Sequence, residues 1–377
     1  MSTALVFGAN GVSGLALLNA LSRTSSTEWK KVIAVSRRPA VLEHADDRVV
    51  FVEADLLGEV GELVEKLKKA GAEETTHVAF YAYVAKADET ELIEVNRKLF
   101  SNSLEAVAKV APGVKAFLLQ TGYKYYGVHK GGEYLAPTPF KEDAPRHTGE
   151  NFYYVQEDML KDAAKKNGWG WLVVRPNFIL GASKGNFMSL ATTVALYAAA
   201  LKAQNKPLVF PGSSASYNFS YDHSTAANNA AFQLFVLQKP EAYNRMFNIH
   251  DGKALKWNEV WPKIAKYFEL ELASPPADDV PAGKTVGKDV VAVHPSAEWA
   301  AQQGSAFDSL VSTHGLSKDA YAYATWDFLD FATARTWPDI ASLDAAREIG
   351  WAKEVDTFEQ GFVAVFEELK KMKVIPQ

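Results

Sequence analysis

The sequence predicts an α/β protein with a doubly wound parallel sheet and a smaller, mainly helical lobe toward its C-terminus. Two observations lead to this fold class. In the first half of the chain, short runs rich in β-branched residues alternate with amphipathic helical stretches, a pattern typical of a parallel sheet covered on both faces. After Gly181 this alternation becomes irregular and helical periodicity dominates, so we assign that part to a separate lobe.

The first half contains six runs that we expect to be strands and four that we expect to be helices. The strands are predicted at Leu5 to Phe7, Val32 to Val35, Val49 to Val52, His77 to Tyr83, Ala116 to Gln120 and Trp171 to Arg175. The helices are predicted at Gly14 to Ser22, Gly61 to Ala70, Glu91 to Val110 and Phe152 to Asn167. A sheet of this kind binds ligands at the carboxyl ends of its strands.

The second half is expected to form a lobe over that edge of the sheet. Its predicted elements are a helix near Met188 to Gln204, a strand at Pro207 to Phe210, and helices at Trp257 to Phe268 and Thr357 to Met372. Ser274 to Lys288 is rich in proline and glycine, so we expect it to be the most mobile loop. We divide the chain into a ligand-binding core over residues 1–180 and a substrate-binding lobe over residues 181–377, with some strands and helices returning to the core.

Composition excludes several function classes. The 377 residues include 40 Lys and Arg against 45 Asp and Glu, without a basic stripe, so no nucleic-acid partner is expected. The absence of cysteine excludes a disulfide, a Cys-ligated metal and a thiol nucleophile, and the histidine spacing gives no support for a metal site. The apolar runs are too short to cross a bilayer, so we expect no membrane insertion and a cytoplasmic location.

A glycine-rich turn joins the first predicted strand to the first predicted helix. Gly8, Gly11 and Gly14 form a G-x-x-G-x-x-G pattern, with Asn10 and Val12 among them. In this context the first glycine permits a tight turn, the second lets the backbone approach a pyrophosphate, and the third lets helix and strand pack closely. The helix N-terminus then faces the phosphates, which predicts a dinucleotide site in a Rossmann fold. A glycine-rich turn without a ligand is the alternative.

The end of the second strand indicates which dinucleotide binds. Ser36 is followed by Arg37 and Arg38, where an NAD-selective fold places an acidic residue for the ribose 2′-hydroxyl. Two guanidinium groups suit a 2′-phosphate instead, which predicts NADP(H) bound to residues 1–180; a solvated surface pair is the alternative. Asp55 and Leu56, past the third strand, are placed to meet the adenine ring. Further cofactor contacts at or after strand ends are predicted for Ala82, Gln120, Thr121, Pro176 and Ile179.

The catalytic pair common in nicotinamide reductases of this topology is missing in its usual form. Such enzymes place Tyr and Lys four residues apart on a helix, where both lie on one face. The literal match, Tyr126 and Lys130, is a poor candidate because Gly127, Gly131 and Gly132 disfavour a helix. On the expected helix, Glu157 stands where the lysine would be.

Several further motifs run in order along the first two-thirds of the chain. Besides the glycine turn they are Ser36-Arg37-Arg38, Ala54-Asp55-Leu56, Gln120 to Lys124, Asn151 to Tyr154 with Glu157-Asp158, Arg175-Pro176 and Phe247-Asn248-Ile249. Together they resemble the progesterone 5β-reductase and iridoid synthase-like enzymes, a divergent branch of the short-chain dehydrogenases. The N-F-Y-Y-x-x-E-D and T-G-x-K motifs are specific, whereas the glycine run is shared by many dehydrogenases. The resemblance implies a Rossmann fold of the extended short-chain dehydrogenase type.

The resemblance also implies the catalytic residues and the reaction. Carried over by motif, the lysine is Lys124 of the T-G-x-K loop and the tyrosine is Tyr153, the first of the Y-Y pair. The implied reaction is reduction of an enone or enal, with hydride delivered from NADPH to the β-carbon. Tyr153 would then stabilise the enolate oxygen, and Lys124 would favour that charge, lower the pKa of the tyrosine and help to hold the nicotinamide ribose.

Other functions remain compatible with these residues. A carbonyl reductase, which sends hydride to the carbonyl carbon, would use the same pair, and a non-catalytic NADP(H)-sensing protein would keep only the cofactor site. Sugar-nucleotide epimerisation is a weaker alternative because the usual Tyr-Lys spacing is missing.

The sequence says less about the substrate and the assembly. Tyr125 replaces the histidine that usually follows the loop lysine, and the later lobe is only loosely similar to the family. We expect a small apolar carbonyl substrate, and a homodimer is an open possibility. Phe187, Met188, Tyr197 and Trp337 are candidates to line its pocket, although each is also explained as core.

Overall fold

The computed structural model describes residues 1–184, 186–276 and 293–377. Most of the predicted mobile loop, Ser274 to Lys288, lies outside these residues. The description below therefore covers the sheet, its flanking helices and most of the C-terminal lobe.

A seven-stranded sheet forms the centre of the molecule, and all its strand pairs are parallel. The strands, in spatial order, are β10 (Arg245–Ile249), β6 (Gly170–Pro176), β5 (Ala116–Gln120), β4 (His77–Phe80), β1 (Ser2–Phe7), β2 (Trp29–Ser36) and β3 (Val49–Glu53). The order reverses between β1 and β4, which opens a crevice at their carboxyl ends. The predicted doubly wound fold is confirmed.

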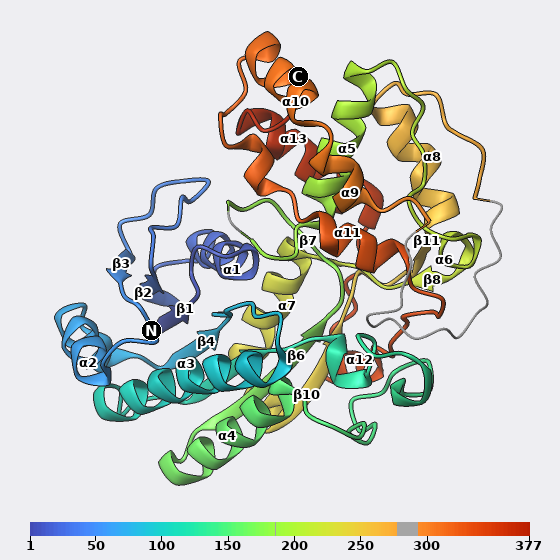
Figure 1. Ribbon diagram of the computed structural model, residues 1–377. Coiled ribbons are helices and arrows are strands. Elements are labelled where there is room, and N and C mark those ends of the chain that lie inside the picture. Colours follow the sequence, from blue (N-terminus) through green and yellow to red (C-terminus); the bar gives the residue numbers. More distant parts are fainter. Residues whose placement is uncertain (185, 277–292) are drawn as a thin grey trace.

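Helices cover both faces of the sheet (Figure 1). On one face lie α2 (Val60–Lys69), α3 (Glu89–Val110) and α4 (Phe152–Asn167), and on the other lie α1 (Val12–Ser22), α7 (Ala226–Leu237) and α12 (Asp344–Glu348). Side chains of one strand alternate between the two cores: Leu5 and Phe7 join the first, whereas Ala4 and Val6 join the second. Strands buried on both faces need continuous apolar runs, which the sequence has.

The C-terminal lobe is mainly helical, as predicted, and lies over the carboxyl edge of the sheet (Figure 1). Its helices are α5 (Leu190–Ala203), α6 (Ser214–Asn218), α8 (Trp257–Tyr267), α9 (Ser296–Ala301), α10 (Gly304–His314), α11 (Trp326–Thr333), the π-helical segment Thr357–Val363 and α13 (Ala364–Lys371). Short strands β7 (Ile179–Leu180), β8 (Ser220–Tyr221), β9 (Ser224–Thr225) and β11 (Leu255–Lys256) connect it to the core. The division at residue 180 stays a prediction, since β10 and α7 come from the second part but belong to the sheet layers.

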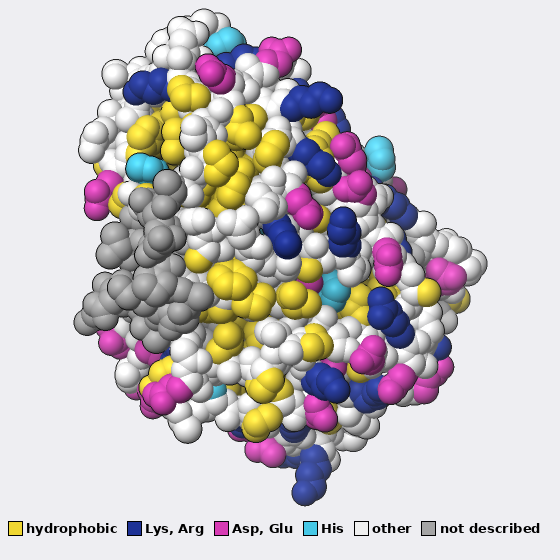
Figure 2. All heavy atoms as spheres, turned by 90° about the vertical axis from the view of Figure 1, so that its right-hand side faces the viewer, with side chains coloured by type: hydrophobic (Ala, Val, Ile, Leu, Met, Phe, Trp, Pro, Cys, Tyr) yellow, Lys and Arg dark blue, Asp and Glu magenta, His cyan; other side chains and the backbone are white. Residues whose placement is uncertain are grey.

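The surface carries mixed charges. In the face drawn in Figure 2, Lys and Arg side chains alternate with Asp and Glu, and apolar side chains gather near its centre. This face has no continuous basic stripe, which agrees with the net charge of −5.

Three expectations about local structure need correction. The predicted strand at Pro207 to Phe210 is wrong, because Leu208 makes only an isolated bridge with Leu272. The strand predicted at His77 to Tyr83 ends at Phe80, and the next three residues leave the sheet to line a groove. The seventh strand, β10, was expected only as a family motif and not as a strand.

Candidate active site

Two hollows meet at the carboxyl edge of the sheet. The strand-end groove, about 340 Å³, follows the glycine turn and the ends of β1, β2 and β4. The lobe cavity, about 780 Å³, lies between the ends of β5 and β6 and the helices α9 and α11. Residues shared by both hollows are Val12, Thr121, Tyr153, Ile179, Asn186, Phe187 and Met188. Because the two hollows share these walls, ligands in them would lie next to each other.

The glycine turn leaves the helix N-terminus open to the groove. Gly8 has φ +78°, and a Cβ at this position would lie 2.7 Å from the backbone nitrogen of Ala82. A Cβ at Gly14 would lie 2.3 Å from the Gly8 carbonyl oxygen, so this glycine packs helix against strand and does not line the groove. Gly11 is the N-cap of α1 without a capping side chain, and the first turn has no acidic residue. The uncapped N–H groups suit an anionic ligand.

Two unpaired cations stand at the end of β2. Arg37 and Arg38 are exposed and line the groove, and neither forms an ion pair with any residue that the structure describes. Ser36 fixes this turn by donating its hydroxyl to the Arg38 carbonyl at 2.7 Å. Free guanidinium groups at this place fit a phosphate, as the sequence predicts.

The remaining predicted cofactor residues also line one of the hollows. Asn10, Gly11 and Val12 lie in the groove at the glycine turn, with Asp55, Leu56, Ala82, Gln120, Thr121 and Ile179 further along it. Pro176 lines the lobe cavity. Apart from Gly14, every predicted cofactor residue therefore faces a hollow; their binding role stays a prediction.

Gln120 and Thr121 form the wall between the groove and helix α7. Gln120 donates to the Ser13 hydroxyl at 2.9 Å and accepts from Gln233 at 2.8 Å and Asn229 at 3.2 Å. The Thr121 hydroxyl is buried and has no hydrogen-bond partner among the described residues. Because buried hydroxyls usually find a partner, this oxygen is available to a ligand.

Tyr153 and Lys124, which are far apart in sequence, are brought together by one side chain. Asn151 is the N-cap of α4, and its side-chain oxygen accepts the Tyr153 N–H at 3.0 Å. Its amide nitrogen donates to the Lys124 carbonyl at 2.8 Å. The Tyr153 hydroxyl also lies close to the lysine loop, since a Cβ at Gly122 would be 3.4 Å from it. Both residues line the lobe cavity, and Tyr153 lines the groove as well.

Burial keeps the tyrosine protonated. It raises the pKa of Tyr153 well above the usual value, and the nearby Tyr83 adds to this shift. Burial also lowers the pKa of Lys124, and the charge of Glu89 opposes that effect. Desolvation therefore dominates the pKa of Tyr153 in this structure, and a lowering by Lys124 stays a prediction. A neutral phenol at this place acts as a hydrogen-bond donor.

Lys124 belongs to a short 3₁₀ turn, Tyr123–Tyr126, which we call the lysine turn. The side chain of Arg175 packs against this turn. The Arg175 guanidinium lies 3.4 Å from the centroid of the Tyr125 ring and donates to the Tyr126 hydroxyl at 3.2 Å. Arg175 also donates to Glu157 at 2.9 Å, and both side chains are almost fully buried. Glu157, at the position of the usual lysine, thus supports the turn that carries Lys124.

The lobe cavity is mainly apolar. Its apolar wall includes Val128, Phe178, Ala297, Ala300, Trp326, Phe328 and Phe331. Phe187 and Met188 line it as expected, whereas Tyr197 and Trp337 do not. Tyr197 packs against Trp299 in the helical core, and Trp337 packs over Gly131. The expectation for these two residues is wrong because aromatic side chains more often fill cores.

The sequence reasoning missed three residues of the site. Lys184 lines the groove, the buried Arg335 lines the lobe cavity, and Asn151 links Tyr153 to Lys124. An asparagine before an amphipathic helix is an N-cap signal, so the first role of Asn151 was within reach. Nothing in the sequence pattern indicates the other two.

Neither a metal site nor a membrane span is found among the described residues. They contain no group of three or more His, Asp or Glu side chains placed to hold a metal ion. In the same part of the chain, no helix is long and apolar enough to span a bilayer.

Comparisons with known proteins identify the family of this chain. The model of the PRISE-like Rossmann-fold domain matches residues 4–376. A short chain dehydrogenase of Penicillium aethiopicum is 32% identical over 100% of this chain and 99% of its own length. The (S)-8-oxocitronellyl enol synthase of Catharanthus roseus is 30% identical over 100% of this chain and 92% of its own length.

Solved structures support the same fold at greater distance. The UDP-glucose 4-epimerase of Thermotoga maritima has a TM-score of 0.65 and 16% identity, with 98% of this chain and 99% of that chain covered. A dTDP-glucose 4,6-dehydratase of Bacillus anthracis in complex with NAD has a TM-score of 0.64 and 14% identity, covering 98% and 97%. The sequence motifs, the fold and the full-length match lead to one assignment. The chain belongs to the PRISE-like Rossmann-fold family and is an oxidoreductase of the short-chain dehydrogenase type.

Proposed function

We propose that this protein is an NADPH-dependent reductase that adds hydride to the β-carbon of a conjugated enone or enal. The observation that carries the proposal is the Asn151 bridge, which holds Tyr153 and Lys124 at one wall of an apolar cavity. That cavity shares residues with the groove, so a substrate in it would meet a cofactor bound there.

The residues of the groove fit a phosphorylated dinucleotide. The uncapped start of α1 suits the pyrophosphate, and the exposed Arg37 and Arg38 suit a 2′-phosphate, which favours NADPH over NADH. The unpartnered Thr121 hydroxyl suits a ligand oxygen near the junction. When bound, NADPH would supply the hydride of the reaction.

Tyr153 and Lys124 would act on the carbonyl oxygen of the substrate. As negative charge collects on this oxygen, the hydrogen bond from the neutral phenol strengthens, which lowers the barrier. The ammonium group of Lys124 favours the same charge from the loop beside it. Because the pair is fixed before the substrate binds, little reorganisation is needed during the reaction.

The cavity wall indicates the class of substrate. Its alanine and phenylalanine side chains suit a hydrocarbon skeleton, and a volume of about 780 Å³ accommodates a small to medium-sized molecule. The plant relatives are enol synthases by name, which is consistent with an enolate formed by addition of hydride to the β-carbon.

The test is NADPH consumption with a panel of enones and enals, combined with identification of the products. A saturated aldehyde or ketone is the expected product, and Tyr153→Phe should lose this activity. An allylic alcohol would instead identify a carbonyl reductase with the same residues. NADPH binding without any turnover across the panel would favour a cofactor-sensing protein and contradict the proposal.

A further inference from the structure

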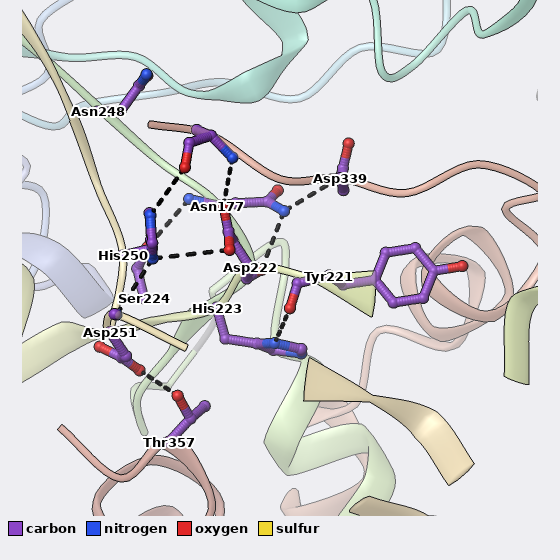
Figure 3. Close-up of polar contacts among 12 residues, drawn as sticks. Asn177, Tyr221, Asp222, His223, Ser224, Asn248, His250, Asp251, Asp339 and Thr357 are labelled. Atoms are coloured by element: carbon purple, nitrogen blue, oxygen red, sulfur yellow. Dashed lines mark hydrogen bonds and ion pairs between the residues drawn. The ribbon is translucent and has the colours of Figure 1, made fainter. Parts of the chain in front are cut away.

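A buried polar cluster lies behind the loop that carries Lys124. We call it the Asp222 cluster and define it by Tyr123, Asn177, Asp222, His250 and the backbone of Ala341. Figure 3 shows Asp222 between Asn177 and His250, with polar contacts on several sides. Asp222 is 1% exposed and follows β8, so it comes from a segment remote in sequence from the lysine loop.

Tyr123, the residue before Lys124, is attached to this cluster. Its hydroxyl donates to Asp222 Oδ2 at 3.0 Å, and the Ala341 N–H donates to the same oxygen at 2.6 Å. The Tyr123 ring packs edge-on against Tyr126 and Phe140, each with centroids 5.6 Å apart. With Asn151 holding the Lys124 carbonyl from the other side, the backbone of the lysine is fixed at two neighbouring points.

The second oxygen of Asp222 faces a nitrogen that carries a lone pair. His250 Nδ1 accepts from the Gly252 N–H at 3.2 Å, and its Nε2 lies 3.2 Å from the Ala341 carbonyl oxygen, to which it must donate. Nδ1 is therefore the unprotonated nitrogen. Asp222 Oδ1 lies 3.6 Å from Nδ1 and has no hydrogen-bond partner among the described residues. Two acceptors at this separation repel each other unless one carries a proton.

The proton belongs on Asp222. Protonation of His250 at Nδ1 would abolish its hydrogen bond from Gly252, whereas a neutral Asp222 can turn an O–H toward Nδ1. Burial acts in the same direction, since it raises the pKa of Asp222 to about 7 and lowers that of His250 to about 4. The charged and titratable groups around Asp222 are Tyr123 from the 3₁₀ turn, His250 and Asp251 from the segment after β10, and Asp339 with its partner Arg335, reached through Asn177.

We propose that Asp222 is a positioning residue for Lys124, acting as a neutral carboxyl group that holds Tyr123. The inference rests on the proposed function in so far as Lys124 serves the reaction. An acid in this state offers Oδ2 as the acceptor for Tyr123 and Ala341 and carries its proton on Oδ1, which removes the repulsion between Oδ1 and the unprotonated Nδ1 of His250. Lys124 lines the lobe cavity, and fixing the neighbouring residue restricts the backbone from which its ammonium group extends.

Asp222→Asn is the variant that tests the neutral state of the carboxyl group most directly. Asp222→Asn keeps one acceptor and one donor, whereas Asp222→Leu keeps neither, and Tyr123→Phe removes the link while retaining the ring. We expect Asp222→Asn to retain kcat within about 3-fold. Asp222→Leu and Tyr123→Phe should lower kcat by about 10-fold or more while leaving the Kd of NADPH unchanged. Tyr243→Phe, which removes a tyrosine hydroxyl bonded to the Leu237 carbonyl, is the matched control.

A second measurement does not depend on turnover. The rate of reductive methylation at Lys124, measured by mass spectrometry relative to the rate at Lys130, reports how firmly the ammonium group is held. We expect this relative rate to change by at least about 3-fold in Tyr123→Phe and Asp222→Leu, and to stay at the wild-type value in Asp222→Asn and Tyr243→Phe. If Asp222→Leu fails to fold, Tyr123→Phe carries the test.

The outcomes separate this inference from the proposed function. Wild-type labelling and wild-type kcat in Tyr123→Phe would overturn the positioning role. Equal damage in Asp222→Asn and Asp222→Leu would overturn the neutral state of the acid. The expected labelling pattern in a protein that reduces no enone would keep the positioning role and refute the reductase.

Discussion

The strand-end groove and the lysine turn lie on opposite sides of Tyr153 and are built differently. In the groove, Arg37 and Arg38 are exposed and form no ion pair with the described residues. In the turn, Tyr123, Tyr125 and Tyr126 are buried and are held by Asp222, Arg175 and Asn248. The groove keeps these two arginines free for a ligand, whereas the turn has its polar groups satisfied by the protein itself.

This difference predicts that the groove determines the affinity for its ligand and that the lysine turn affects the rate of turnover. Groups that gain partners only when a ligand arrives contribute to binding, and their removal should raise a dissociation constant. Groups that are fixed beforehand contribute to preorganisation, and their removal should lower turnover. The two sides of Tyr153 should therefore respond to substitution in different kinetic parameters.

The largest effect is expected for Tyr153→Phe, which removes the phenol hydroxyl at the place where the groove and the lobe cavity meet. We expect kcat for enone reduction to fall about 10²- to 10³-fold, because a hydrogen bond that strengthens in the transition state is lost. The Kd of NADPH, measured by fluorescence titration, should stay within a few-fold of the wild type. An unchanged rate would remove Tyr153 from the reaction.

On the groove side, the double variant Arg37→Ala with Arg38→Ala should act on cofactor selectivity. We expect the Kd of NADPH to rise about 30- to 300-fold through loss of charge-assisted hydrogen bonds to the 2′-phosphate, with little change for NADH. Calorimetric titration of both cofactors gives the measurement. Arg23→Ala, at an exposed arginine paired with Glu43, is the control. Equal losses for both cofactors would contradict a phosphate clamp.

Asp222, which holds the lysine turn through Tyr123, predicts that the stability of the protein depends on pH. Burial raises the pKa of Asp222 to about 7 in the folded protein, against about 3.9 for an unfolded aspartate. Between these values the folded state binds more protons, so the free energy of unfolding falls as pH rises from about 4 to 7. Asp222→Asn should lack this loss and gain up to about 4 kcal/mol relative to the wild type by the upper end of that window. Parallel stability curves in urea would contradict the shifted pKa.

A smaller effect is expected at Gly122, which separates the turn from Tyr153. A Cβ there would lie 3.1 Å from the Pro176 carbonyl oxygen and 3.4 Å from the Tyr153 hydroxyl. Gly122→Ala should therefore shift the phenol slightly and lower kcat by about 10-fold. Gly61→Ala, where a Cβ meets nothing within 4 Å, is the matched control and should leave the rate unchanged. The same loss in both variants would exclude a local effect.

The sequence predicted the elements that local signals define. Helix α4 was predicted with its observed bounds, because Asn151 caps its start and Gly168, at φ +73°, ends it. The glycine turn and the Arg37-Arg38 pair were found for the same reason, since each lies within one short segment. By contrast, β10 is a five-residue strand that follows helix α7 and a short 3₁₀ turn, and its place beside β6 depends on tertiary pairing.

The supporting residues of the site could not be predicted in this way. Asp222, His250 and Ala341 come from separate segments, and only the fold brings them to Tyr123. Glu157 looked like a lost catalytic position, yet its burial with Arg175 gives it a structural role. Motif resemblance supplied Lys124 and Tyr153, and the Asn151 bridge that joins them needed coordinates.

The two halves of the lobe cavity have different origins along the chain. Tyr153 and Lys124 precede residue 178, whereas Ala297, Ala300 and Phe328 come from α9 and α11. Protein engineers can thus change the part of the wall that these helices contribute while leaving Tyr153 and Lys124 unchanged. The same independence would let natural selection change the shape of the cavity without altering Tyr153 or Lys124.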